Sequence, residues 1–443
     1  MAWQAAAGKA EITPPVGTPM GGYGTPFGGT PRLAVGTSNP LWARSVVLWD
    51  NGRPHVLLCA DILGWSTDAA TMVRQQVAAA TALPEARLLL TSTHTHNGPA
   101  VPGVADPWLV YELTDTAPLA AYEEFLVDTV VSLVLELLAG PREVVTVDYQ
   151  VTSAPFSANR EDLPYTESDV PVLVARRADG TPVAVVFGYG CHPVCAGMLD
   201  LWDGDYPAVA AGLIDDAFPD GVAVFLPGPA GDQDPVGPRG AALSLDCGAQ
   251  LADAVRSVAD IPARRLTRVS AARLSTAELP LDVSLDPGNL AVARDFYAER
   301  ASQPGPGWEL RHAALMVELI EAGEPLATTV DLPVQGWRLT GTPALRLAFV
   351  GGEIVSGYAV YLRGRFGGAE GLWFGGYGPG TVAYLPSDEL LPPLRSGGSY
   401  AGGWNPDFPG LAGGSMCAYG WPGHFLAGGV QTPIVDAVTG VVV

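Results

Sequence analysis

The chain has 443 residues, of which 48% are hydrophobic and 16% charged, and this is enough apolar material for a large buried core. Its formal net charge of −22 at pH 7 disfavours nucleic acid or an anionic membrane surface as a partner, because like charges repel. No apolar run reaches the roughly 18 residues that a membrane span needs, so we expect no such span.

The cysteines and the amino terminus indicate a reducing compartment. The five cysteines are too few for a disulfide framework, and they stand at scattered positions: Cys59, Cys191, Cys195, Cys247 and Cys417. The first residues lack a basic segment followed by an apolar one, which a secretory signal would have. We therefore predict a cytoplasmic protein.

The first 260 residues predict alternating strands and helices. After a Gly/Pro-rich ordered loop at 8–32, we expect strands at 44–50, 55–63, 86–94 and 143–151, a hairpin within 170–190, and a strand at 221–227. The expected helices cover 67–81, 120–140, 206–218 and 240–259. Apolar strands that alternate with helices predict an α/β fold with a mixed, partly parallel central sheet flanked by helices.

The pattern changes near residue 260. Strands are expected at 268–281, 327–339 and 344–357, and helices at 287–302 and 308–323. The last 70 or so residues are rich in Gly, Trp and Tyr and show little periodicity. Because no clear linker separates the two parts, we predict one domain over 1–443 with a soft internal boundary near 260.

Two of the six histidines, His94 and His96, follow the apolar run 88–90. In a strand, residues i and i+2 point to the same face, so the two imidazoles could meet one metal ion, or a metal and a substrate. Two turn residues that bond the backbone are the alternative. Strand ends in α/β sheets are where ligands usually bind, which favours the functional interpretation.

A third histidine has the same setting. His192 ends the apolar strand predicted within 170–190 and precedes Pro193. Cys191 and Cys195 flank it, but their spacing matches no zinc framework, and buried cysteines are usually small apolar residues.

Carboxylates stand at two more junctions between a strand and a loop. Asp232 and Asp234 follow the strand 221–227 in a Gly/Pro-rich turn, where they could orient a ligand or a water molecule, or simply form the turn. Glu353 lies between an apolar strand and an apolar helix. It could complement the helix dipole or bind a metal ion.

The order of these motifs resembles the neutral, non-lysosomal ceramidases and ceramidase-like proteins. The most specific match is THTHNGPA at 93–100, which is close to the Thr-His-Thr-His-Ser-Gly-Pro motif of that family. Further similar segments are MGGYG (20–24), NPLWARSVVL (39–48), LLCADILG (57–64), ANRED (158–162), CHPV (191–194), GDYP (204–207), GPAGDQDP (228–235), VGGEIVSG (350–357) and VAYLPSDE (382–389). Together these matches span nearly the whole chain.

The resemblance implies a catalytic domain with one zinc ion. In that family two His, a Glu and a Tyr hold the zinc, and the matching positions here are His94, His192, Glu353 and Tyr384. The family's zinc activates a water that attacks an amide carbonyl. His96 would stabilise the oxyanion or the leaving group beside the metal.

Further matches and departures concern the substrate. Arg160 would bind the polar part of the substrate, and Asp232 or Asp234 would assist the reaction. Asp234 stands where the ceramidases have a serine, so a serine nucleophile is not available at that position. The chain also leaves no room for their carboxyl-terminal β-sandwich domain, and we expect a soluble small molecule in place of a long-chain lipid.

The sequence therefore predicts a zinc-dependent hydrolase that cleaves an amide (N-acyl) bond of a small molecule. An esterase, a lactonase or an acyl-transfer or cyclisation enzyme on the same site is an alternative, and so is a metal-free binding or scaffold relative. The segment 397–425 could line the pocket or could only pack as an ordered loop. The oligomeric state stays open.

Overall fold

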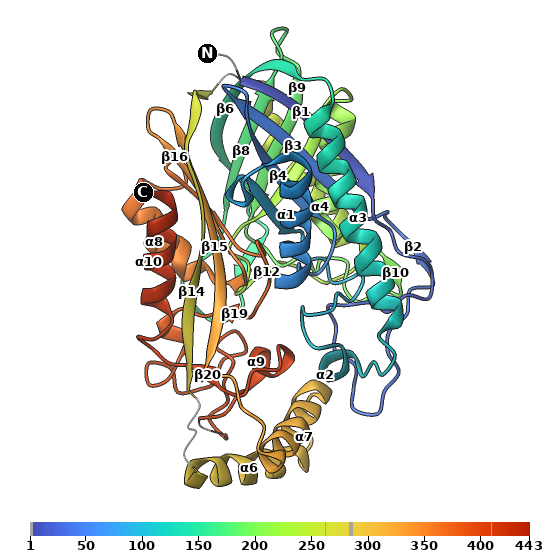
Figure 1. Ribbon diagram of the computed structural model, residues 1–443, viewed down its shortest axis with the longest axis vertical. Helices are drawn as coiled ribbons and strands as arrows, with labels where there is room; N and C mark the ends of the chain where they lie inside the picture. Colours follow the sequence, from blue (N-terminus) through green and yellow to red (C-terminus); the bar gives the residue numbers. More distant parts are fainter. Residues whose placement is uncertain (1–2, 262, 283–286, 409) are drawn as a thin grey trace.

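The computed structural model describes residues 3–261, 263–282, 287–408 and 410–443, and it contains two large sheets that pack face to face (Figure 1). The larger sheet has nine strands in the order β11-β9-β8-β6-β1-β3-β4-β5, with β13 paired to β6. Its strands are β1 (Trp3–Glu11), β3 (Trp42–Asp50), β4 (Arg53–Ala60), β5 (Leu88–Ser92), β6 (Glu143–Ser153), β8 (Asp169–Arg176), β9 (Pro182–Tyr189), β11 (Val222–Pro227) and β13 (Arg264–Leu266).

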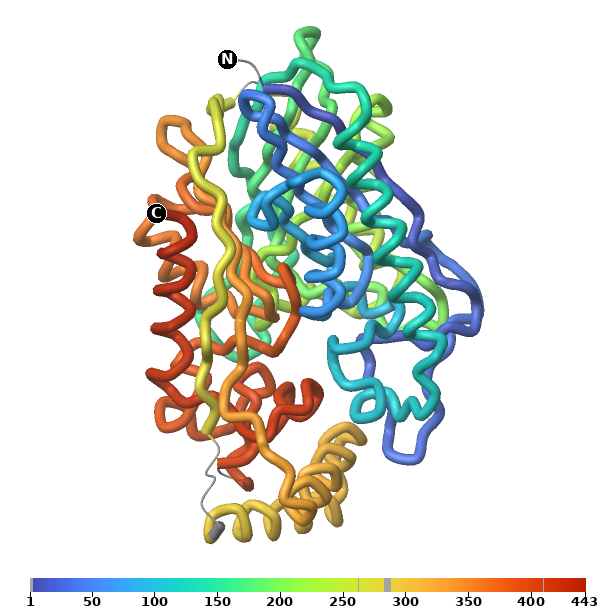
Figure 2. Tube along the Cα trace, in the orientation of Figure 1, coloured from blue at the N-terminus to red at the C-terminus, as the bar shows by residue number. Residues whose placement is uncertain are grey.

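The second sheet has five strands in the order β18-β16-β15-β14-β20. Its strands are β14 (Arg268–Asp282), β15 (Thr329–Thr340), β16 (Leu345–Val350), β18 (Leu372–Gly375) and β20 (His424–Phe425). We call the part of the chain before residue 267 the nine-stranded half and the part after it the five-stranded half. Figure 2 shows the two halves as the blue-to-green and the yellow-to-red parts of the trace.

Alternating side chains explain why the two sheets stack. In β4, Val56 and Leu58 belong to the core beneath the helices, while Leu57 and Cys59 belong to the core that the two sheets share. Trp337 and Phe349 enter that shared core from the second sheet. Because successive side chains of a strand point to opposite faces, each sheet is apolar on both faces and is covered on both.

Helices cover the outer face of each sheet. The nine-stranded sheet is covered by α1 and α3 at one end and by α4 and α5 at the other, while α8 and α10 cover the five-stranded sheet (Figure 1). The layers therefore run helix, sheet, sheet, helix. The helices are α1 (Thr67–Thr81), α2 (Pro107–Tyr111), α3 (Ala117–Ala139), α4 (Asp205–Ala217), α5 (Ala241–Ala259), α6 (Pro287–Ala301), α7 (Gly307–Ala322), α8 (Ser356–Phe366), α9 (Gly414–Ala418) and α10 (Gln431–Val442).

Several short strands and the two 3₁₀ turns that the structure describes lie outside the two large sheets. They are β2 (Gly36–Thr37), β7 (Ser157–Asn159), β10 (Leu201–Trp202), β12 (Gln233–Pro235), β17 (Glu353–Ile354) and β19 (Tyr384–Leu385), with 3₁₀ turns at Glu85–Arg87 and Asp388–Leu390. β17 and β19 pair in parallel and place Glu353 directly beside Tyr384. None of the described helices is long and apolar enough to cross a membrane.

The predicted mixed, partly parallel α/β fold is confirmed. Several predicted bounds were wrong, among them the strand expected at 344–357, which ends at Val350 before β17 and α8, and two of the differences have a clear physical reason. The loop expected from residue 8 begins only after β1, an Ala-rich strand whose small residues give no alternating pattern. The strand expected to reach His94 ends at Ser92, because the chain then turns away with His94 at a φ of 64°. The predicted single domain with a soft boundary near 260 stays a prediction.

Candidate metal centre

The His94 and His96 segment is a turn that the nine-stranded sheet holds by its backbone. After β5 ends, the N–H of Thr93 donates to Ala60 O at 2.9 Å and that of His94 donates to Ile62 O at 3.0 Å. The two imidazoles meet through this turn, with Nε2 of His96 3.3 Å from Nε2 of His94. The pair therefore converges as the sequence suggested, but for a different geometric reason.

A glycine on the amino-terminal loop packs against this turn. A Cβ on Gly22, whose φ is +91°, would lie 2.5 Å from the Cα of His96. Only glycine fits such an approach and such a backbone angle. The loop that carries Tyr23 is thus held against His96, and the two rings make an edge-to-face contact at 5.2 Å.

Main-chain carbonyls orient two of the imidazoles. Nδ1 of His94 lies 2.5 Å from Leu63 O, and Nδ1 of His192 lies 2.9 Å from Ala230 O. A carbonyl can only accept, so Nδ1 carries the proton and donates in both rings. The Nε2 atoms are left as lone pairs, which is how proteins usually prepare a histidine for a metal ion.

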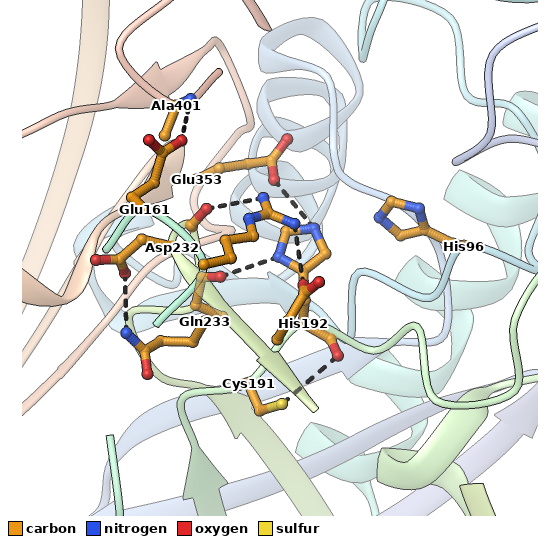
Figure 3. Close-up of polar contacts among 12 residues, drawn as sticks. His96, Glu161, Cys191, His192, Asp232, Gln233, Glu353 and Ala401 are labelled. Atoms are coloured by element: carbon orange, nitrogen blue, oxygen red, sulfur yellow. Dashed lines mark hydrogen bonds and ion pairs between the residues drawn. The ribbon is translucent and has the colours of Figure 1, made fainter. Parts of the chain in front are cut away.

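Glu353, in the short strand β17 of the five-stranded half, brings a carboxylate to these lone pairs. Its Oε2 lies 3.1 Å from Nε2 of His94 and 3.5 Å from Nε2 of His192, and the side chain is almost fully buried. Figure 3 shows the Glu353 carboxylate directed at His192, with His96 on a separate segment of chain. Among the described residues, Nε2 of His192 and Oε2 of Glu353 have no hydrogen-bond partner.

Three acceptor atoms that face one another repel unless a cation lies between them, so this donor set fits a metal ion. The side-chain nitrogens of His94, His96 and His192 lie within 4.8 Å of one another and could hold one. His96 is the most exposed of the three, so it is also the one best placed to touch a substrate.

The protonation states suit metal binding. Burial, with the charges of Arg160 and His94, holds the pKa of His192 well below its ordinary value. Burial and the two other histidines lower the pKa of His96 in the same way. Burial alone would raise the pKa of Glu353, but His94, Tyr419 and Tyr384 outweigh it and lower that pKa. His192 and His96 are therefore neutral, and the Glu353 carboxylate is ionised.

Tyrosines from the five-stranded half support Glu353. The hydroxyl of Tyr419 donates to Glu353 Oε1 at 2.7 Å. Tyr384 stacks over His192 with ring centroids 6.5 Å apart, and its hydroxyl accepts a hydrogen bond from Arg160 at 2.9 Å. The structure thus brings His94, His192, Glu353 and Tyr384 to one place. Their roles as ligands stay proposals.

The two aspartates occupy different positions. Asp232 is fully buried, and its carboxylate accepts from Ser356 N–H at 2.7 Å, Ser356 Oγ at 2.7 Å and Asn159 Nδ2 at 2.7 Å. It ties the 231–235 turn to the start of α8, three residues beyond Glu353. Asp234 is partly exposed and pairs with Arg160 and Arg239. Neither aspartate lines the cavity, and their catalytic roles stay predictions.

A cavity of about 260 Å³ opens at the histidines. Besides His94, His96, His192, Glu353, Tyr384 and Arg160, its wall includes Gly22, Tyr23, Gly24, Leu63, Ala105, Val110, Tyr111, Val194, Arg239, Trp308, Tyr400, Ala418 and Tyr419. The carboxyl-terminal segment 397–425 therefore does line it. His424 points elsewhere, with its ring beside Trp404 and its Nδ1 bonded to Phe425 O.

The sequence did not single out several wall residues, among them Trp308, Arg239 and, within the segment 397–425, Tyr419. Tyr419 follows the five-residue helix α9, which has no useful periodicity. The abundance of Gly, Trp and Tyr in the last part of the chain was the only available signal. Cys191 and Cys195 are buried, and neither lines the cavity.

The fold is similar to that of two solved structures. Neutral ceramidase from Pseudomonas aeruginosa matches with a TM-score of 0.66 and 16% identity, over 100% of this chain and 74% of that chain. A ceramidase complexed with C2 matches with the same TM-score and identity, over 100% of this chain and 75% of that chain. No protein-family model and no curated protein matches the sequence. At this identity the likeness establishes a ceramidase-like fold.

Proposed function

We propose that this protein is a cytoplasmic, zinc-dependent hydrolase that cleaves the amide bond of an N-acylated small molecule. One observation carries the proposal: the Nε2 lone pairs of His94 and His192 face the buried Glu353 carboxylate at the wall of the cavity. The ceramidase-like fold supports the reaction class, because the solved relatives are named ceramidases.

In this proposal His94, His192, Glu353 and Tyr384 hold one zinc ion. Nitrogen and carboxylate donors suit zinc, and all four residues line the cavity through which a substrate would reach the ion. When bound, the ion would supply a Lewis acid that activates water and polarises the amide carbonyl. Burial raises the pKa of Tyr384 well above its ordinary value, so its phenol enters the site protonated.

The chain's own groups position the substrate and move the proton. His96 is neutral and partly exposed to the cavity, so it can donate to the carbonyl oxygen as negative charge develops there. Water adds to the carbonyl carbon and gives up a proton, the C–N bond breaks, and the leaving nitrogen takes up that proton as the amine departs. Arg160 fixes the Tyr384 hydroxyl and stands at the edge of the cavity, where it can hold a polar part of the substrate.

The test is an activity screen with metal-reconstituted protein. N-acyl amines, N-acyl amino acids, lactams and matched esters are offered to the wild-type protein and to His94→Ala. We expect amide hydrolysis that depends on added zinc and is absent from the variant. A protein that binds no stoichiometric zinc, or that cleaves only the esters, would contradict the proposal.

A further inference from the structure

Two guanidinium groups share one carboxylate at the wall of the cavity. Asp234 accepts from Nη1 of Arg160 at 3.0 Å through Oδ1, and from Nη2 of Arg239 at 2.7 Å through Oδ2. Both arginines line the cavity. Two positive charges against one negative charge leave this cluster positive, in a chain whose net charge is −22.

The backbone around Arg239 fixes its position. The N–H of Gly240 donates to Cys195 O at 2.8 Å, and this bond joins the Arg239 turn to the segment that carries His192. A Cβ added to Gly197 would lie 3.4 Å from the Cβ of Arg239, so the two segments are in close contact. Arg239 therefore stands beside a candidate zinc ligand through main-chain contacts, independently of its ion pair.

The two arginines differ in how many donors they have left. Arg160 donates to Asp234, to Gly231 O at 2.8 Å and to the Tyr384 hydroxyl at 2.9 Å. Within the described part of the chain, Arg239 makes a hydrogen bond only to Asp234. Its side chain is 44% exposed, so the rest of its guanidinium is available to a bound molecule.

Other donors without a partner line the same cavity. The Tyr23 hydroxyl and the Trp308 indole nitrogen are buried and have no hydrogen-bond partner among the described residues. Burial raises the pKa of Tyr23 to about 12, so its hydroxyl keeps its proton and can donate. Trp308 can only donate. Guanidinium, phenol and indole groups all donate hydrogen bonds, so together they favour a negatively charged ligand with several acceptor atoms.

We propose that the cavity recognises a carboxylate that the substrate carries close to its amide bond, and that Arg239 selects for it. This inference rests on the proposed amide hydrolysis and deepens it by naming the substrate class, an acidic N-acyl compound. The carboxylate can lie on the amine side, as in an N-acyl amino acid, or on the acyl side, as in a succinamic acid. A neutral amide would leave the positive cluster and the Tyr23 and Trp308 donors unpaired.

The test compares substrates of equal size that differ in charge. Hexanoylglycine is compared with neutral hexanoylglycinamide, and N-propylsuccinamic acid covers the acyl-side arrangement. We expect wild-type kcat/KM for one of the acids to exceed that for the neutral amide by about 10- to 100-fold, as for hydrogen bonds to a charged group. Arg239→Gln should reduce this ratio by about 10-fold or more, and Arg239→Lys should restore part of it.

The matched control is Arg256→Gln. Arg256 is 49% exposed and pairs with Asp253 at 3.2 Å, and it lies outside the cavity. This substitution should leave the acid-to-amide ratio unchanged. An equal kcat/KM for acid and neutral amide in the wild-type protein, or a ratio that Arg239→Gln does not change, would overturn the inference while amide hydrolysis itself still stood.

A binding measurement separates the two proposals if no amide is cleaved. Calorimetric titration of hexanoylglycine, N-propylsuccinamic acid and hexanoylglycinamide into the wild-type protein and Arg239→Gln reports charge selection without turnover. Tighter binding of an acid that Arg239→Gln abolishes would keep the inference and reject the hydrolysis. Equal binding of the acids and the amide would reject the inference.

Discussion

The two halves of the molecule contribute different chemistry to one cavity. The nine-stranded half supplies His94, His96 and His192, and main-chain carbonyls orient two of these rings. The five-stranded half supplies Glu353, whose second oxygen is held by a hydroxyl from another side chain, Tyr419. Nitrogen donors thus come from the nine-stranded half and oxygen donors from the five-stranded half.

This difference suggests a role that the proposed metal ion would have in the fold. The two sheets already share an apolar core, but the acceptor atoms that meet at Glu353 repel one another when no cation lies between them. A cation at this point would turn a repulsive contact between the halves into an attractive one. Removing a metal-binding side chain from either half should therefore have the same consequence, which is loss of the ion.

The largest effect is expected from single substitutions that remove one proposed zinc ligand, either from the nine-stranded half or from the five-stranded half. His192→Ala and Glu353→Ala should each lose stoichiometric zinc and reduce amide hydrolysis by about 10³-fold or more, because the Lewis acid is lost. Elemental analysis after reconstitution and initial rates would measure both. His55→Asn removes an equally buried histidine away from the cavity and should keep the metal. A Glu353→Ala protein with full zinc content would show that the five-stranded half does not supply a zinc ligand through Glu353.

Asp232→Asn should have the next largest effect, because it weakens the link between the halves without touching a proposed ligand. The buried carboxylate accepts three hydrogen bonds of 2.7 Å through its two oxygens. An asparagine amide has only one oxygen, and its NH2 group cannot accept. We expect the free energy of unfolding to fall by about 4 kcal/mol from lost and unsatisfied hydrogen bonds. Urea unfolding of the metal-free protein would measure it. A loss no larger than that of Asp253→Asn, on an exposed side chain, would contradict this role.

His55 tests the contact between the sheets away from the cavity. Its ring packs edge-to-face on Trp337 of the second sheet, and burial, with the charge of Arg87, lowers its pKa from 6.5 to about 4. Below pH 6.5 the unfolded chain therefore binds a proton that the folded chain does not, and this group's stabilisation is lost as the pH falls toward 4.

The wild-type protein should accordingly lose about 3 kcal/mol of unfolding free energy relative to His55→Asn between pH 7.5 and pH 4. Measuring the difference between the two proteins cancels the other groups that titrate in this range. Parallel stability curves for the two proteins would show that His55 is not held neutral between the sheets.

The smallest effect is expected from Tyr419→Phe, which removes only the hydroxyl that supports Glu353. Groups that orient a metal ligand typically change metal affinity by about 10- to 100-fold, so we expect a weaker zinc affinity in that range. Competition with a chelator would measure it. Tyr361→Phe, on the half-exposed face of α8, is the matched control and should leave zinc affinity unchanged.

The sequence predicted the parts of this site that lie next to regular elements. His192 and Glu353 follow apolar strands, and such junctions can be found from the end of an apolar run. The convergence of His94 and His96 was predicted as well, although the strand argument for it was wrong. Their rings meet through a turn with a left-handed residue, and side-chain alternation does not extend to such a turn.

The rest could not be predicted, because it depends on contacts across long stretches of chain. Tyr419 reaches Glu353 from 66 positions away, and Arg239 enters the wall through a turn held by Cys195. Neither segment has a period that indicates which way its side chains point. The stacking of two sheets was likewise missed, since a strand that is apolar on both faces does not show whether a helix or a sheet covers it.

The carbonyl oxygens behind His94 and His192 have a consequence for sequence divergence. Leu63 and Ala230 hold these rings through main-chain atoms, so any side chain that keeps the local backbone path also keeps the orientation of the rings. Glu353, in contrast, relies on side-chain hydroxyls, those of Tyr419 and Tyr384. Over long divergence the residues behind the imidazoles should therefore tolerate substitution, while positions 384 and 419 should be restricted to side chains that can donate to the carboxylate.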